Sequence, residues 1–265
     1  MVSTFSILMM VLTLLICFGL PVALLIFLHK KEQISIKAVL VGVSVFLISQ
    51  VFIRIPILNY VSAMEWYQQM ASNIFLLAVF LSVTAGLFEE TGRYLGFRFP
   101  LKKYLSWKNA VAFGIGHGGI EAIVLTGLTY INNLIYSLSI NNGSYENSIA
   151  PLLGPETAAF IRDQLVSLPP YMYLVAGLER AFTVFIHIAL SLVVLSAVVR
   201  GRKIYLILAV LLHALVNFPV VMIPGLGFSV LYVELYLLAL AIVSIVWILR
   251  SRDGFPDPSQ SDNGN

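Results

Sequence analysis

The chain has 265 residues, of which 59% are hydrophobic and only 11% are charged, with a formal net charge of +3. Because a soluble domain carries about a quarter charged residues, these values exclude a soluble globular enzyme, a disordered chain and a nucleic-acid-binding protein with a basic surface. They indicate a protein that contacts the lipid bilayer over most of its length, and we expect an integral protein of a prokaryotic plasma membrane.

Seven apolar runs are long enough to cross a bilayer, for which a helix needs about 20 residues. They predict an all-α, polytopic membrane helix bundle that forms a single transmembrane domain over residues 1–250. The chain has one cysteine, Cys17, which lies in the first run. A single cysteine excludes a disulfide framework or a Cys-based metal site. The runs lie at about residues 4–28, 36–53, 73–96, 110–137, 174–199, 204–223 and 228–249.

Lys and Arg are concentrated in every second connection between the runs. They follow the first, third, fifth and seventh runs, at Lys30, Lys31, Lys37, Arg98, Lys102, Lys103, Lys108, Arg200, Arg202, Lys203, Arg250 and Arg252. The alternate connections hold only Arg54 and Arg162. Since cytoplasmic loops carry the excess of basic residues, we expect the N-terminus outside and the C-terminus inside.

Residues 138–173 form the only sizeable connection that the sequence predicts outside the membrane. The stretch from Asn141 to Ser144 has turn chemistry, and the apolar spacing of residues 156–168 predicts a short interfacial helix. Residues 251–265 are rich in Asp, Ser, Gly, Pro and Asn, which predicts a disordered cytoplasmic tail.

Ionisable and amide side chains occur at membrane depth, where polar groups are costly and usually face the bundle interior or a water-filled cavity. They are Glu89, Glu90, Arg93, His117, Glu121, Glu179, Arg180, His187, His213 and Asn217. At 1.5 Å per residue, Glu89, His117 and His213 lie about 10–14 Å from the cytoplasmic ends of their runs. We therefore expect these three to face one cavity open to the cytoplasm.

A second polar layer follows from the same depths. Glu121, His187 and Asn217 lie about 16–20 Å from the cytoplasmic ends. His117 and Glu121 share a helix face at i,i+4, and so do His213 and Asn217. This spacing suits a carboxylate general base held by histidines, with an imidazole or amide donor for a developing oxyanion.

Structural interpretations stand beside the functional ones. Arg93 can pair with Glu89 at i,i+4 or with Glu90 at i,i+3, and Glu90–Arg93 is equally interpreted as an ion pair that only stabilises the bundle. Glu179–Arg180 is typical of an interfacial pair, and His187 can bridge helices through a hydrogen bond. The glycines around His117, at 114, 116, 118 and 119, favour close helix packing.

Three motifs on separate runs resemble a known superfamily. Glu89–Arg93 has the form EExxR, Phe113–His117 the form FxxxH, and His213–Asn217 the form HxxxN. In this order they resemble the type II CAAX prenyl endopeptidases and bacteriocin-processing membrane proteases, over about residues 73–223. The stretch GIGHGGIEA and the overall layout look most like the YhfC branch, which is related more distantly to the Aph scaffold subunit of γ-secretase.

The resemblance implies an intramembrane endopeptidase that hydrolyses a membrane protein or a lipidated peptide near the cytoplasmic leaflet with a glutamate-activated water. Glu89 would match the water-activating carboxylate and His117 its partner. His213 and Asn217 would match the oxyanion-stabilising and orienting pair, and Glu90 with Arg93 completes the first motif. Glu121 and His187 lie outside the motifs, so only their depth indicates a role.

Several alternatives stay open. No HExxH motif occurs, and we expect no cofactor, although a zinc site built from His117, His187, His213 and a glutamate is chemically possible. A non-catalytic scaffold is the alternative from another functional class, but Glu89 with His117 favours an enzyme because a scaffold needs no base. A proton-coupled transporter is disfavoured, since the sequence shows no inverted repeat.

Overall fold

The structure is a computed structural model that describes residues 1–255, and it is helical throughout these residues, with no strand. Seven of its helices are long and apolar enough to cross a membrane, which confirms the predicted all-α bundle and an integral membrane protein. They are Thr4–Glu32, Ile36–Ser62, Ile74–Arg98, Trp107–Asn142, Pro170–Val199, Ile204–Gly225 and Val230–Arg250. Most extend a few residues beyond the predicted runs.

Three of the spans contain a short π-helical segment. The first consists of α1 (Thr4–Leu14), η1 (Leu15–Gly19) and α2 (Leu20–Glu32). The second consists of α3 (Ile36–Phe46), η2 (Leu47–Arg54) and α4 (Ile55–Ser62), and the fourth of α7 (Trp107–Glu121), η3 (Ala122–Gly127) and α8 (Leu128–Asn142). The other spans are α6 (Ile74–Arg98), α12 (Pro170–Val199), α13 (Ile204–Gly225) and α14 (Val230–Arg250).

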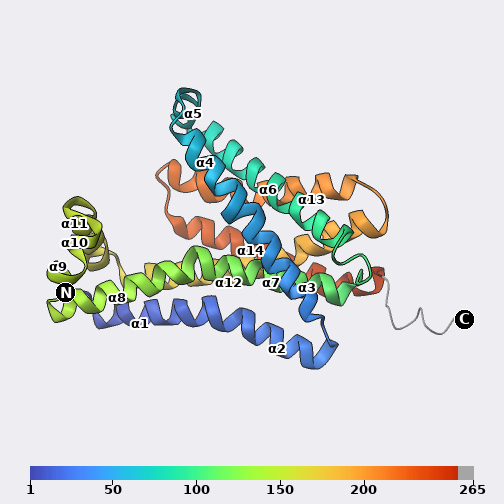
Figure 1. Cartoon of the computed structure of the whole chain (residues 1–265), viewed down its shortest axis with the longest axis horizontal. Coiled ribbons are helices and arrows are strands. Elements are labelled where there is room, and N and C mark those ends of the chain that lie inside the picture. Colours follow the sequence, from blue (N-terminus) through green and yellow to red (C-terminus); the bar gives the residue numbers. More distant parts are fainter. Residues whose placement is uncertain (256–265) are drawn as a thin grey trace, which may run out of the picture.

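The fifth span, α12, lies at the centre of the bundle. It packs against α1, α6, α7, α13 and α14, and its apolar window is the most buried of the seven. Figure 1 shows α12 and α7 along the middle of the molecule, with α1 and α2 on one side and α6 and α13 on the other. The functional side chains described below come from the helices that meet around α12.

Bulky apolar side chains from α6, α7 and α12 form the largest core, and glycines let the backbones approach. Phe97, Phe113 and Leu192 are fully buried in it. A Cβ on Gly116 would collide with the backbone carbonyl of Val39 in α3, so α3 and α7 touch backbone to backbone. This confirms that the glycines of α7 serve close helix packing.

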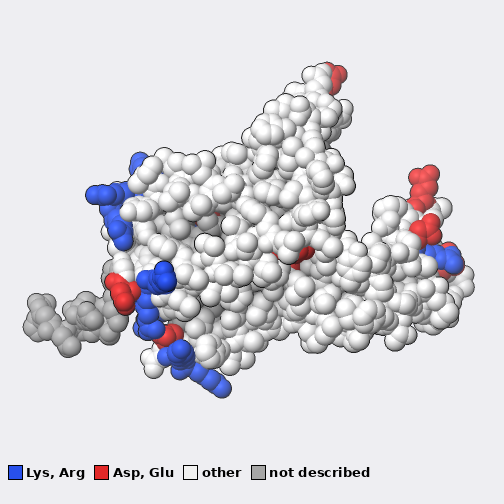
Figure 2. Space-filling model, turned by 180° about the vertical axis from the view of Figure 1, so that it is seen from behind, with Lys and Arg blue, Asp and Glu red and all other residues white. Residues whose placement is uncertain are grey.

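The two ends of the bundle differ in charge. The end that carries the connections 30–37, 98–108 and 200–203 and residues 250–252 is called the basic end here, and the opposite end, with α5 (Glu65–Ala71) and α9–α11, the loop end. Figure 2 shows most of the Lys and Arg side chains gathered at the basic end. The N-terminus lies at the loop end (Figure 1), and Arg252, which follows α14, pairs with Glu32 at the basic end.

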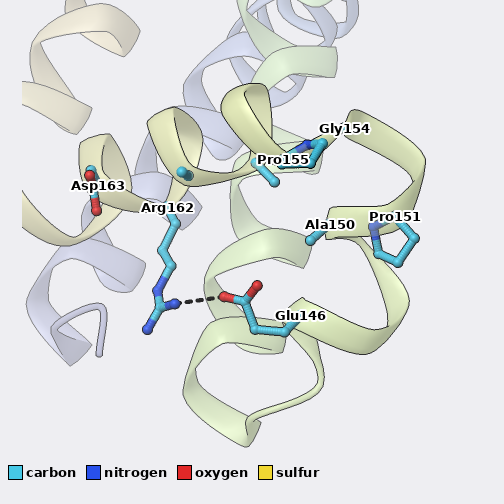
Figure 3. Close-up of a pocket in the computed structure, with 9 residues that line it drawn as sticks. Glu146, Ala150, Pro151, Gly154, Pro155, Arg162 and Asp163 are labelled. Carbon is cyan, nitrogen blue, oxygen red and sulfur yellow. Dashed lines mark hydrogen bonds and ion pairs between the residues drawn. The ribbon is translucent and has the colours of Figure 1, made fainter.

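The loop end contains the predicted connection after α8. Gly143 ends α8 in the left-handed region, with φ 81°, and α9 (Tyr145–Ser148), α10 (Ala150–Leu153) and α11 (Pro155–Ser167) follow. Helix α11 matches the short helix expected at residues 156–168. These helices enclose a surface pocket of about 430 Å³, bridged by an ion pair of 2.6 Å between Arg162 and Glu146 (Figure 3).

Two expectations about connections are corrected. The second span continues past Arg54, because its guanidinium points into the bundle and donates to the carbonyl of Leu81 at 2.7 Å; α4 and α5 therefore add a second element at the loop end. At the basic end, residues 251–255 are ordered, because Arg252 pairs with Glu32 at 3.0 and 2.7 Å. The rest of the predicted tail, 256–265, lies outside the described residues.

Candidate metal-binding active site

Helix α6 supplies the two glutamates and the arginine of the first motif. Its small residues Ala78, Ser82, Ala85 and Gly86 and then Glu89, Glu90 and Arg93 are buried, so this face of α6 points to the bundle interior. Glu89 is 4% exposed and Glu90 is 0% exposed. Adjacent helix positions point about 100° apart, and the two carboxylates accordingly meet different partners.

Glu89 is the point at which the predicted site residues converge. Its Oε2 atom lies 2.9 Å from Nε2 of His117 and 4.0 Å from Nδ1 of His187. Its Oε1 atom lies 3.7 Å from Nε2 of His213. The structure therefore brings Glu89, His117 and His213 together as the depth argument predicts, and it adds His187 to the same group.

A glutamine that the sequence analysis missed also holds Glu89. The amide nitrogen of Gln50, in η2, donates a hydrogen bond to Oε1 of Glu89. Nη1 of Arg54 in turn donates to Oε1 of Gln50 at 3.1 Å. The sequence contains one signal for this contact, because Gln50 is a polar side chain in the middle of an apolar run. The structure adds a second, since π-helical segments such as η2 are frequent at functional sites.

Glu90 pairs with Arg93 rather than with the cavity. Nε of Arg93 lies 2.9 Å from Oε2 of Glu90, and Nδ1 of His213 lies 2.7 Å from Oε1 of Glu90. Arg93 also donates to Oγ of Ser191 at 2.6 Å and to the carbonyl of His187 at 3.2 Å. Of the two pairings that the spacing allows, the structure has Glu90–Arg93, and Glu89 is left to the histidines.

The predicted second layer is joined to the first through His187. Nε2 of His187 lies 2.6 Å from Oε2 of Glu121, and Nη1 of Arg180 donates to Oε1 of Glu121 at 3.0 Å. Arg180 also bonds its neighbour Glu179, as expected for that pair. The contact between Arg180 and Glu121 joins α12 to α7 and was not predicted, because pairing between distant helices depends on their rotation about their axes.

A cavity of about 80 Å³ borders Glu89, which is room for several water molecules, since one needs about 10–15 Å³ of such space. Its polar lining includes Glu89, Glu121, Arg180, His187, His213 and Asn217. Asn217 lies one turn from His213 on α13, and it makes no hydrogen bond to another site residue in the part of the chain that the structure describes.

The cavity extends in a direction that differs from the expectation. The sequence predicts an opening to the cytoplasm, and the positive-inside rule predicts that the basic end faces the cytoplasm. The lining residues instead continue from Glu89 through Thr183, Asn217 and Val220, all of which lie on the loop-end side of Glu89. On the basic-end side, Phe97 and Phe113 are fully buried between α6, α7 and α12. A groove of about 340 Å³ between α12, α13 and α14 also lies on that side, but its lining is almost wholly apolar and includes none of the charged site residues.

Four side chains are close enough to hold one metal ion. Glu89, His117, Glu121 and His187 each offer one ligand atom, and these atoms lie within 4.8 Å of one another. Two imidazole nitrogens and two carboxylate oxygens form a donor set that suits Zn²⁺. The zinc set expected from the sequence, His117, His187, His213 and a glutamate, shares both histidines of this group. His213 lies beside the group, with Nδ1 bonded to Glu90 and Nε2 at 3.7 Å from Oε1 of Glu89, and Glu121 is the second carboxylate.

An unpartnered buried atom agrees with this donor set. Oε2 of Glu121 is buried and has no aligned hydrogen bond within the described residues, although Nε2 of His187 lies 2.6 Å away. A buried carboxylate oxygen without a hydrogen bond is costly unless a cation neutralises it. The residues present therefore fit a divalent ion.

Comparison with known proteins gives one family. The YhfC intramembrane metalloprotease family matches residues 14–246. The chain is 32% identical over 257 residues to the protein described as "Uncharacterized membrane protein YhfC" of Bacillus subtilis (strain 168), which covers 96% of this chain and 100% of the relative. No solved structure matches the chain. The family description does not support the expectation that no cofactor is needed, and it agrees with the metal-dependent alternative. The chain belongs to the YhfC intramembrane metalloprotease family.

Proposed function

We propose that the protein is a metal-dependent intramembrane endopeptidase that hydrolyses a peptide bond of a membrane protein or lipidated peptide in the cavity beside Glu89. The observation that carries this proposal is the meeting of ligand atoms of Glu89, His117, Glu121 and His187 within 4.8 Å. Three of these residues, Glu89, Glu121 and His187, line a polar cavity. The description of the family supports the same chemistry.

The four clustered side chains would hold the ion. Bound there, a zinc ion would supply Lewis acidity for the scissile carbonyl and would acidify water at neutral pH. Gln50 restrains the Glu89 carboxylate through its amide, and Arg180 restrains the Glu121 carboxylate at 3.0 Å. Such outer contacts fix the orientation of ligands and tune a metal site.

His213 is placed to move a proton. Glu90 lies 2.7 Å from Nδ1 of His213, so we assign the proton of the neutral imidazole to Nδ1. The other nitrogen, Nε2, then faces Glu89 at 3.7 Å and can accept a proton from water or deliver one to a leaving amine. Asn217 lines the same cavity and can donate its amide to a developing oxyanion.

Arg93 positions the two histidines that flank Glu89. It pairs with Glu90, which holds His213, and it donates to the backbone carbonyl of His187 at 3.2 Å. Because Arg93 is fully buried and lies one turn away from Glu89, we assign it a positioning role rather than contact with the substrate.

A metal-free mechanism is the second candidate. Among the described residues, no Lys or Arg lies within ion-pair distance of the Glu89 carboxylate, which contacts Gln50 and imidazoles instead. Such a carboxylate can activate water directly as a general base, as the resemblance to the CAAX-type superfamily implies. Kinship with that wider superfamily is itself part of this proposal and rests on the three motifs.

Cleavage by the purified protein tests the proposed function. The full chain in liposomes is incubated with reporter membrane peptides, and wild type is compared with Glu89→Gln. A matched control is Glu65→Gln, the same exchange on the exposed helix α5. We expect cleavage by wild type and by Glu65→Gln but not by Glu89→Gln. Equal cleavage by wild type and Glu89→Gln would refute the assignment.

A further inference from the structure

The site separates two unlike halves of the bundle. Toward the basic end, the buried Glu90–Arg93 pair is followed by an apolar core in which α6, α7 and α12 pack closely. The groove of about 340 Å³ between α12, α13 and α14 on this side is lined almost wholly by apolar side chains. Phe97 lies two turns from Glu89 on α6, Phe113 lies one turn from His117 on α7, and Leu192 and Leu195 follow His187 on α12; all four are 0% exposed. Water has no path to Glu89 through this packed core.

From Glu89 toward the loop end, the interior is polar and partly open. The cavity continues between α12 and α13, past Thr183 and Val220. Glu179 and Arg180 border it with 25% and 12% of their side chains exposed. Charged side chains at membrane depth are stable where they line a water-filled space. Glu179 and Arg180 line the cavity on the loop-end side of the site, and among the described residues no charged side chain lines it on the basic-end side.

The outer shape agrees with this opening. Figure 2 shows a deep notch at the loop end, between one arm formed by α4, α5 and the start of α6 and another formed by α8–α11. The cavity extends from Glu89 toward this end of the molecule. At the basic end, Figure 2 shows no comparable notch on the face in view, and several Lys and Arg side chains project from the surface there.

The charge of the basic end indicates which end of the bundle faces the cytoplasm. Its connections hold nearly all the basic residues outside the spans, and cytoplasmic loops carry this excess. The loop end is then extracytoplasmic. We propose that the site is open to the extracytoplasmic side, so that water reaches Glu89 between α12 and α13 from the loop end. The substrate segment enters by the same route, which rests on the proposed function.

Cysteine labelling tests the direction of access without requiring proteolysis. The natural cysteine is removed as Cys17→Ser, and single cysteines are introduced as Thr183→Cys and Val220→Cys, which line the cavity. The matched variant is Ser196→Cys, on the same helix as Thr183 but on the basic-end side of His187; Thr183 is 9% and Ser196 5% exposed. Ser148→Cys in α9 and Lys203→Cys after α12 report the orientation.

Each variant is treated with a charged, membrane-impermeant maleimide in right-side-out and in inside-out vesicles, and the labelled fraction is measured by mass. We expect Thr183→Cys and Val220→Cys to react at least about tenfold faster from the extracytoplasmic side, as Ser148→Cys does. Ser196→Cys should be protected from both sides, and Lys203→Cys should react only in inside-out vesicles.

Three results would overturn the proposal. One is faster labelling of the cavity cysteines in inside-out vesicles. Another is their failure to react from either side while the two loop cysteines react. The third is labelling of Lys203→Cys in right-side-out vesicles, which would invert the orientation. Because the readout is chemical labelling, an inactive protein tests the route of access as well as an active one, and failure of the proposed peptidase activity is detected separately.

Discussion

Two neighbouring glutamates lie in contrasting surroundings. Glu90 is fully buried and bonded by Arg93 through two nitrogens and by His213, so its charge is neutralised inside the protein. Glu89 is bonded by the amide of Gln50 and by His117, and it borders a cavity. The difference shows that one helix face can hold a charge for packing while the next position keeps a carboxylate available for chemistry.

The largest expected effect is on catalysis at Glu89. Glu89→Gln removes a carboxylate that serves as a metal ligand or base, so we expect cleavage to fall by at least about 10²–10⁴-fold. Gln has nearly the same shape, and the thermal unfolding temperature in detergent should stay close to that of wild type. A Glu89→Gln protein that is active, with an inactive but folded Glu90→Gln protein, would reverse the two roles.

Substitutions at the buried Glu90–Arg93 pair are expected to lower the free energy of unfolding. Arg93→Met removes the arginine from buried Glu90 and leaves it His213 as its remaining partner; breaking a buried ion pair costs about 3–5 kcal/mol. Glu90→Gln should also be destabilising, because it leaves Arg93 buried without its carboxylate. Unfolding in detergent measures both. The control is Arg162→Met, which breaks an ion pair whose side chains are 52% and 59% exposed and should cost less than about 1 kcal/mol. Equal effects of the buried and exposed substitutions would contradict this account.

An intermediate effect on metal affinity is expected at Gln50, which holds the Glu89 carboxylate through a hydrogen bond. Gln50→Leu removes the amide that donates to Glu89, and outer contacts of this kind are worth about 10–100-fold in metal affinity or activity. Zinc titration of the purified protein gives the affinity. Ser49→Ala is the matched control in the same π-helical segment, since Ser49 bonds only the backbone of its own helix. An unchanged zinc affinity in Gln50→Leu would remove Gln50 from the site.

The smallest effect is expected at the cavity mouth. Glu179 is 25% exposed and bonds only Arg180 among the described residues, whereas Arg180 keeps Glu121 as a second partner. Glu179→Gln should therefore change the free energy of unfolding by less than about 1 kcal/mol and leave zinc affinity unchanged. A large loss of zinc affinity would show that Glu179 belongs with the clustered ligands.

Hydropathy and depth predicted much of this molecule. The seven spans follow from apolar run length, and the convergence of Glu89, His117 and His213 follows from counting residues along helices whose direction alternates along the chain. Neither run length nor depth indicates how each helix is rotated about its axis. For this reason Gln50 and the contact between Arg180 and Glu121 were missed.

The direction of the cavity was missed for a related reason. Depth along a helix locates a residue but does not say on which side the packing is tight. The packing around Glu89 is decided by bulky residues such as Phe97 and Phe113 from two helices, together with glycines such as Gly116 that bring backbones together. Only their combination in space forms the tight core on the basic-end side of Glu89.

Metal content measured together with activity tests the central claim most directly. The account predicts about one zinc ion per chain in the purified protein, loss of cleavage on treatment with a strong chelator, and recovery when zinc is returned. Glu89→Gln and His117→Ala should both lose the bound metal. Full cleavage by metal-free protein in the presence of chelator would contradict the account and assign water activation to Glu89 alone.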